Sequence, residues 1–220
     1  MIEHSTISFL KQLSENNNRE WFNFHKGDYE VARQDILNFT SQVITGLSEF
    51  DNSIPADLNP KDCVMRIYRD IRFSNDKTPL KTNFGIAISS NGKNFKGPGY
   101  YLNVQPGNSF IAGGSWFPEA DELKAIRQEI DYNGSLLHEI IDNADFKKYF
   151  GELDREGALK TTPKGYNAEH EDIYYLKLKS FTATHKISDK ILTRKDSVEQ
   201  ILSAFKNLYP LMVFLRNAIA

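Results

Sequence analysis

The sequence predicts an α+β protein with a central antiparallel β-meander flanked by N-terminal and C-terminal helices. Near both ends of the chain, apolar residues recur at three- and four-residue steps, which is the helical period. The middle instead contains short apolar runs separated by turn residues. Helices and strands are therefore grouped, as in α+β folds, and do not alternate as in βαβ folds. No convincing linker divides the chain, so we expect one domain over residues 1–220.

The composition is typical of a folded cytoplasmic protein. The 220 residues are 40% hydrophobic and 25% charged, which is ordinary for a globular domain. No apolar run approaches the ~18 residues of a membrane span, and the first residues lack the features of a secretory signal. Cys63 is the single cysteine, which excludes an intramolecular disulfide.

The N-terminal part is expected to be helical. Ser5 or Thr6 is a suitable cap for a first helix, which the asparagines at 16–18 end. A short helix capped by Asn18 follows, and we expect its Trp21 to pack in the core between the N-terminal helices.

A long helix is expected after Gly27, from an Asp28 cap to about Leu47. The Pro- and Asn-containing residues 51–60 then indicate a loop.

Four strands are expected in the middle of the chain. The alternation of side chains over 63–68 predicts the first strand, and the others are expected at 84–88, 100–105 and 109–112, with Pro106-Gly107 as the last turn.

The remainder is expected to be mostly helical. Pro118 suits the first turn of a helix that Asn133-Gly134 ends, and a second helix continues to about Ile141. A late strand is expected over 179–187. A final helix opens at Asp196 and is interrupted by Pro210.

Basic residues are concentrated in one segment. The net charge is −2, which makes nucleic-acid binding unlikely, yet residues 61–81 contain six basic and three acidic residues. Arginine binds phosphate or carboxylate through two donors, and lysine adds a point charge. We expect a cleft for a small anionic or phosphorylated ligand, lined by Arg66, Arg69, Arg72, Lys77 and Lys81, with Lys164 from a Pro-Lys-Gly loop. Asp70 or Asp76 would orient these donors, or act as general base if the ligand is turned over.

Residues 66–83 carry a resemblance to a known family. They are similar to the stretch R-x-Y-R-D-x-R-F-S-x-D-K-x-P-Y-K-T-N of an uncharacterised protein family of bacteria and fungi, although Leu80 replaces the family's usual Tyr. The resemblance covers nearly the whole chain, with further landmarks at Asn17-Asn18-Arg-Glu-Trp-Phe, Gly99-Tyr-Tyr-Leu, Gly113-Gly114 with Pro118, Ile126-Arg127 and Pro163-Lys-Gly165. It implies an α+β fold and no assigned activity.

The arginines are not expected to share one role. Arg66 and Arg72 have the same parity along a strand, whereas Arg69 has the opposite parity. We therefore expect Arg69 to pair with a carboxylate as a structural group, and Arg72 and Lys77 to reach the ligand.

An alternative function remains open. In this alternative the arginines and aspartates of residues 61–81 pair with one another and only stabilise the fold. The protein would then be a non-catalytic protein–protein interaction module. Its basic patch would dock an acidic partner, or the acidic residues 117–156 of a second copy. The sequence does not decide the oligomeric state or whether the protein is an enzyme.

Other signatures are incomplete. Ser74 and Lys77 match S-x-x-K of serine acyl enzymes, but Pro79 disfavours the helix that this motif needs. His138 and Asp142 are one helical turn apart without an evident third ligand, so we expect no metal. No nucleotide-binding glycine motif occurs, and no cofactor is expected.

Overall fold

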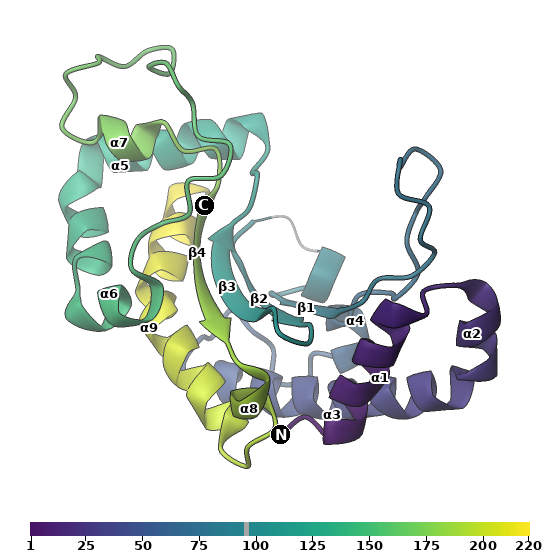
Figure 1. Cartoon of the computed structure of the whole chain (residues 1–220). Helices are drawn as coiled ribbons and strands as arrows, with labels where there is room; N and C mark the ends of the chain where they lie inside the picture. Colours follow the sequence, from purple (N-terminus) through teal and green to yellow (C-terminus); the bar gives the residue numbers. More distant parts are fainter. Residues whose placement is uncertain (95–96) are drawn as a thin grey trace. The chain divides into compact units, whose positions relative to one another are not determined.

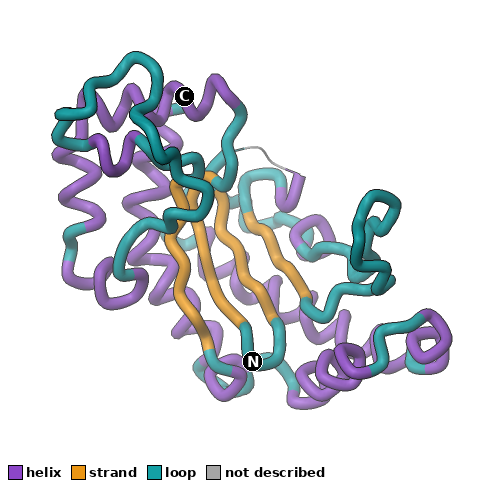
Figure 2. Tube along the Cα trace, turned by 45° about the horizontal axis from the view of Figure 1, so that its top comes forward, coloured by secondary structure: helices purple, strands orange, loops and turns teal. Residues whose placement is uncertain are grey.

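In the computed structural model, which describes residues 1–94 and 97–220, four strands form one sheet in the order β1-β2-β3-β4. The strands are β1 (Phe84–Ile88), β2 (Gly99–Val104), β3 (Ser109–Ser115) and β4 (Phe181–Ile187), and Figure 2 shows them side by side. The sheet is antiparallel and is flanked by N-terminal and C-terminal helices, which confirms the α+β class.

The helices are labelled in Figure 1 where there is room. They are α1 (His4–Glu15), α2 (Arg19–Phe24), α3 (Lys26–Ser48), α4 (Pro60–Cys63), α5 (Ala120–Ile141), α6 (Ala144–Phe150), α7 (Ile173–Leu176), α8 (Asp189–Leu192) and α9 (Ser197–Ala218), with the 3-10 turn η1 (Gly92–Asn94).

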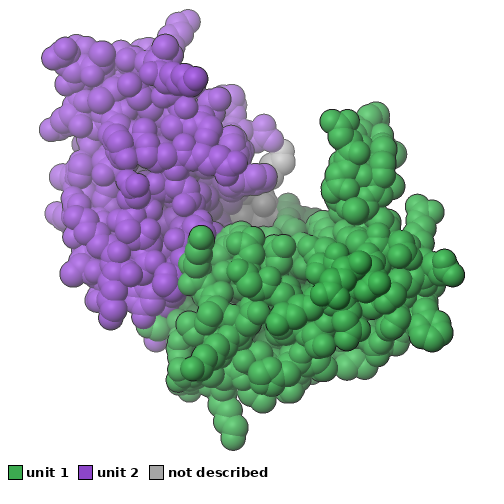
Figure 3. All heavy atoms as spheres, viewed as in Figure 1, with its two compact units in different colours: residues 1–94, 101–111, 186–203 green, residues 95–100, 112–185, 204–220 purple. Residues whose placement is uncertain are grey.

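The chain divides into two compact units, coloured separately in Figure 3. Unit 1 contains residues 1–94, 101–111 and 186–203, and unit 2 contains residues 95–100, 112–185 and 204–220. Each unit is therefore assembled from segments that are far apart in the sequence. The expected single domain stays a prediction.

Helices α1 and α3 pack together in unit 1. The buried stripe of α1 includes Phe9, Leu10 and Leu13, which is the stripe that the apolar spacing predicts. Trp21 is half-buried, stacks on His25 with ring centroids 4.0 Å apart, and lies 6.2 Å from the Phe9 ring. Trp21 thus packs between α1 and α2, but less deeply than a core residue.

The start of α1 differs from the prediction. The helix begins at His4, so Ser5 and Thr6 lie inside it and do not cap it. Asp35 of α3 anchors the start of the helix, because its Oδ2 accepts hydrogen bonds from Glu3 N at 2.9 Å and Thr6 Oγ1 at 2.6 Å. A tertiary contact thus holds the start of α1 against α3.

Asn18 caps α2 as predicted, since its Oδ1 accepts a hydrogen bond from Trp21 N at 2.9 Å. Helix α3 begins at Lys26, directly after His25. Asp28 is therefore not its cap, and lies in the first turn, where a negative charge also favours the helix.

Residues 63–68 do not form the first predicted strand. The side chain of Asn59 caps α4 and Pro60 occupies its first turn, so a helical start signal prevails there over the alternation of side chains. Between α4 and β1 the described residues form only isolated antiparallel bridges, Val64 with Ile86 and Tyr68 with Leu80.

Strands β1, β2 and β3 confirm the rest of the predicted meander, with β3 extending to Ser115. Gly107 has φ +73°, a conformation that glycine adopts without strain, and its N–H donates to Asp189 Oδ1 at 3.0 Å. The predicted late strand is present as β4.

Helix α5 bends where the sequence predicts a stop. Asn133 has non-helical angles of φ −129° and ψ 34°, but the helix continues to Ile141. The helix also begins at Ala120, after Pro118, which is therefore not in its first turn. Gly134, next to the bend, faces the carboxylate of Asp172.

Pro210 does not interrupt α9, contrary to the prediction, because the helix runs through it to Ala218. The proline is exposed, while Leu208, Leu211 and Met212 around it are fully buried. Burial of these side chains offsets the hydrogen bond that the proline removes.

Candidate functional site

The segment 66–83 forms a loop that is closed at its base in unit 1. Leu80 donates its N–H to Asn17 Oδ1 at 3.2 Å and accepts at its carbonyl from Asn17 Nδ2 at 2.9 Å. Lys81 N donates to Ile67 O at 2.7 Å across the two arms. The residues between these contacts project from unit 1, as Figures 1 and 3 show.

Arg69 ties the two arms of the loop together. Its Nη1 donates to the Asp76 carboxylate and to the Thr78 hydroxyl, which is the carboxylate pairing that the sequence predicts. The Asp76 carboxylate also accepts from Thr78 N at 2.9 Å. These donors, the Thr78 N–H first, lower the pKa of Asp76 to about 2. A carboxylate with such a pKa is a poor general base near neutral pH.

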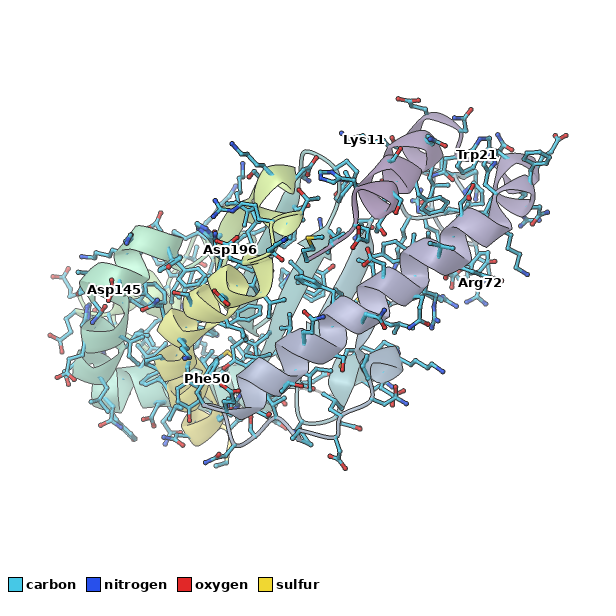
Figure 4. All side chains as sticks on the ribbon, turned by 90° about the horizontal axis from the view of Figure 1, so that it is seen from below. Lys11, Trp21, Phe50, Arg72, Asp145 and Asp196 are labelled. Atoms are coloured by element: carbon cyan, nitrogen blue, oxygen red, sulfur yellow. The ribbon has the colours of Figure 1, made fainter. Side chains whose placement is uncertain are left out.

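Arg72 and Lys77 lie on the exposed part of the loop. Arg72 binds Asp70 through two hydrogen bonds, Nε to Oδ1 at 3.0 Å and Nη2 to Oδ2 at 2.7 Å. This contact lowers the pKa of Asp70. The Arg72 side chain, labelled in Figure 4, is 76% exposed, and Lys77 Nζ donates to Ile71 O at 3.0 Å. The sequence did not predict the Arg72–Asp70 pair.

Arg66 and Lys81 differ from the other cations of the loop. Within the described part of the chain, neither side chain forms an ion pair with a carboxylate. Lys81 is half-buried, and burial first and then the Arg66 guanidinium lower its pKa. Two like charges thus lie near each other, with one of them partly removed from water. Such a pair is destabilising unless an anion lies between the charges.

Lys164 is exposed and belongs to unit 2, whereas the other predicted ligand-binding residues belong to unit 1. Arg66, Arg69, Arg72, Lys77 and Lys81 lie with Asp70 and Asp76 on one loop, in which the ion pairs are Arg69 with Asp76 and Arg72 with Asp70.

Two further residues lie next to the loop and were not predicted as part of a site. Burial is the main cause of a raised Tyr29 pKa on α3; the nearby Tyr68 adds to the rise, and the nearby Arg33 opposes it. The four-residue spacing of Tyr29 and Arg33 on a predicted helix showed that they share a face. Nothing in the sequence connected that face to residue 68.

A second candidate is a groove of about 510 Å³ in unit 2, lined by Ser135, His138, Glu139, Asp142, Glu171 and Asp172. At its centre, His138 Nε2 lies 2.6 Å from Oδ1 of the buried Asp172 carboxylate, and Nδ1 lies 3.5 Å from Asp142 Oδ2. The hydrogen bond to Asp172 is the main cause of a raised His138 pKa. Carboxylates thus face both ring nitrogens and favour the imidazolium form.

The His138–Asp172 contact and two contacts of His170 attach residues 170–172 to α5. Asp172 N donates to His170 Nδ1 at 2.9 Å, and His170 Nε2 contacts Asp131 Oδ1 at 2.9 Å. Across the described residues, no group of three or more His, Cys, Asp or Glu side chains is arranged to hold a metal ion. The contacts of His138 therefore hold two parts of unit 2 together.

Comparisons with known proteins identify a family without an activity. No helix among the described residues is both long and apolar enough to span a membrane. No curated protein and no solved structure matches the chain. A family model described as "Conserved hypothetical protein (DUF2461)" matches residues 5–214. This match covers almost the whole sequence, so the chain belongs to the DUF2461 family of conserved hypothetical proteins.

Proposed function

We propose that the protein binds a small anionic ligand, a phosphate or a phosphorylated metabolite, at Arg66 and Lys81 in the base of the 66–83 loop. The observation that carries the proposal is that neither of these neighbouring cations forms an ion pair in the described structure, although Lys81 is half-buried. The Asp70 carboxylate is near enough to Arg66 to have its pKa lowered by it, but its ion pair is with Arg72. An anion that contacts both cations would remove their mutual repulsion and form charge-assisted hydrogen bonds.

The other charged residues of the loop have supporting roles in this proposal. Arg69 and Asp76 hold the loop in shape through their contact. Arg72 and Asp70 form an exposed pair, which stabilises little and can exchange partners when an anion arrives. Lys77 adds a positive charge on the same loop. Both aspartates have lowered pKa values, which favours a role in orienting the arginines over a role as general base.

Isothermal titration calorimetry with inorganic phosphate and with ribose 5-phosphate tests the proposal. We expect Arg66→Ala and Lys81→Ala each to weaken binding by about tenfold or more, since a hydrogen bond to a charged group contributes about 1.5–3 kcal/mol. Lys11→Ala is the matched control, because Lys11 is an exposed lysine of unit 1 outside the loop. If Arg66→Ala and Lys81→Ala bind the anions as tightly as the Lys11→Ala control, or if the wild type binds neither anion, the proposal is contradicted.

A second candidate function is docking of a protein partner through the loop. Phe73 is 96% exposed beside Arg72, whose guanidinium lies 5.8 Å from the phenyl ring. A fully exposed aromatic residue next to a cation is frequent in protein interfaces. The acidic residues 117–156 of a second copy are a suitable partner in charge. Sedimentation velocity at low and high ionic strength tests this candidate, which predicts salt-sensitive association that Phe73→Ala abolishes.

A further inference from the structure

The groove of unit 2 has more carboxylates than its own contacts use. Its volume is about 510 Å³, and four of its six lining residues carry a carboxylate. The contacts described above occupy Asp142 and Asp172. Glu139 and Glu171 are exposed and form no ion pair in the part of the chain that the structure describes. These two carboxylates are therefore left for cations of another molecule.

Apolar side chains lie beside the carboxylates of the groove. Leu136 is 47% exposed and directly follows the lining residue Ser135 on α5. Tyr175 of α7 packs edge-on against the lining residue His138, with ring centroids 5.5 Å apart. A groove with both carboxylates and apolar side chains suits a partner that presents positive charge together with an aromatic ring.

The exposed part of the 66–83 loop presents both. Arg72 is 76% exposed, and the neighbouring Phe73 is 96% exposed. Residues 66–83 contain five basic and two acidic residues, an excess of three positive charges. The exposed pair of Arg72 with Asp70 stabilises little, so Arg72 can exchange Asp70 for another carboxylate at small cost. The loop projects from unit 1 in Figure 3, which leaves these side chains accessible to another molecule.

We propose that Arg72, Phe73 and Lys77 of one copy dock in the unit 2 groove of a second copy, with the two basic side chains on its free carboxylates. This inference rests on the second candidate function above and names the surface that receives the loop. Pockets of roughly 300–1,000 Å³ hold a whole small molecule, so a groove of about 510 Å³ has room for these side chains. The contact is small, and we expect weak, transient association, as for interfaces below about 1,200 Å².

Reversal of the charges on each side tests the contact by sedimentation velocity over a series of protein concentrations. Wild type should associate at low ionic strength and dissociate at high ionic strength, because salt screens exposed charges. The double variants Glu139→Lys/Glu171→Lys and Arg72→Glu/Lys77→Glu should each stay monomeric. An equimolar mixture of the two should associate again, because each loop then meets a groove of opposite charge. A folding defect in either variant would not produce this recovery.

Two controls show whether the groove itself is the receiving surface. Asp121→Lys/Glu156→Lys reverses two exposed carboxylates of the acidic residues 117–156 that do not line the groove, and this variant should associate as the wild type does. Carbodiimide cross-linking of isotope-labelled with unlabelled wild type should join Lys77 of one copy to Glu139 or Glu171 of the other. This measurement requires no variant.

The outcomes separate the inference from the functions proposed above. A wild type that is monomeric at every ionic strength overturns the inference and the second candidate function, and does not bear on the anion site at Arg66 and Lys81. Association that loop reversal abolishes but groove reversal preserves overturns the groove and leaves the second candidate function standing. Equal loss in the Asp121→Lys/Glu156→Lys control, or no recovery in the mixture, also overturns the groove as the receiving surface.

Discussion

The imidazole Nε2 of His138 lies 2.6 Å from Oδ1 of Asp172, a carboxylate that is 3% exposed and 34 residues later in the chain. The pair joins α5 to the segment before α7, and the ring of Tyr175 packs edge-on against His138 with centroids 5.5 Å apart. Asp142 faces the other ring nitrogen and also binds Lys147 Nζ at 2.8 Å. The lining residues Glu139 and Glu171 add negative charge. This environment makes the contact sensitive to the protonation of His138.

We expect the stability of unit 2 to depend on pH through His138. The carboxylate partners raise its pKa in the folded protein above the unfolded value, which is ~6.5. The added stability is therefore fully present below the unfolded pKa and is lost as pH rises through the folded pKa. Urea unfolding of wild type and His138→Gln should give midpoints whose difference shrinks as pH rises above the unfolded histidine value of ~6.5. A difference independent of pH contradicts this role, and NMR titration of the imidazole measures its pKa directly.

Gly134→Ala should destabilise the protein because the new methyl group meets the same carboxylate. A Cβ at this position would lie 2.0 Å from Asp172 Oδ2. Overpacking of this kind costs roughly 1–3 kcal/mol. Gly27→Ala is the matched control, since nothing lies within 4 Å of a Cβ in that helical position. The control should stabilise the protein by about 0.5–1 kcal/mol, and urea unfolding measures both free energies. Equal effects of the two substitutions contradict the close approach of Gly134 and Asp172.

Arg69→Ala and Arg72→Ala should show which of the two arginines holds the loop in shape. Arg69 contacts both Asp76 and Thr78, and its side chain is only 26% exposed, so its loss should lower the unfolding midpoint and loosen the loop. Arg72 is 76% exposed and should leave the midpoint unchanged. Hydrogen exchange of the Thr78 N–H, which donates to Asp76, should speed up in Arg69→Ala only. Comparable protection in both variants contradicts the assignment of Arg69 as the structural arginine.

Trp21→Ala should lower stability by roughly 2–3 kcal/mol. A fully buried aromatic side chain costs about 3–5 kcal/mol when truncated to alanine, and Trp21 is half-buried. Phe24→Ala in the same helix is the control, because Phe24 is 87% exposed and should change stability by less than about 0.5 kcal/mol. Chemical denaturation measures both variants. A wild-type midpoint for Trp21→Ala rejects its packing between α1 and α2.

The sequence by itself determined the features that depend on near neighbours in the chain. The apolar spacing located α1, and Asn18 marked the start of α2. The turn at Pro106-Gly107 and the short apolar runs located β1, β2 and β3. Local signals also placed Arg66 and Lys81 in the most basic segment. These features follow from helix period, capping and turn geometry, each of which acts over a few residues.

Only the tertiary structure decided which side chains meet. Asp35 binds the start of α1 from another helix, and Asn17 closes the 66–83 loop by binding Leu80 from 63 residues away. The same holds for Asp172, which reaches His138 across the bend in α5. The distribution of carboxylates within the loop, on Arg69 and Arg72 but not on Arg66 or Lys81, also depends on the folded path of the chain. The physical reason is that electrostatic and hydrogen-bond partners are chosen by distance in space, which periodicity and local propensity do not encode.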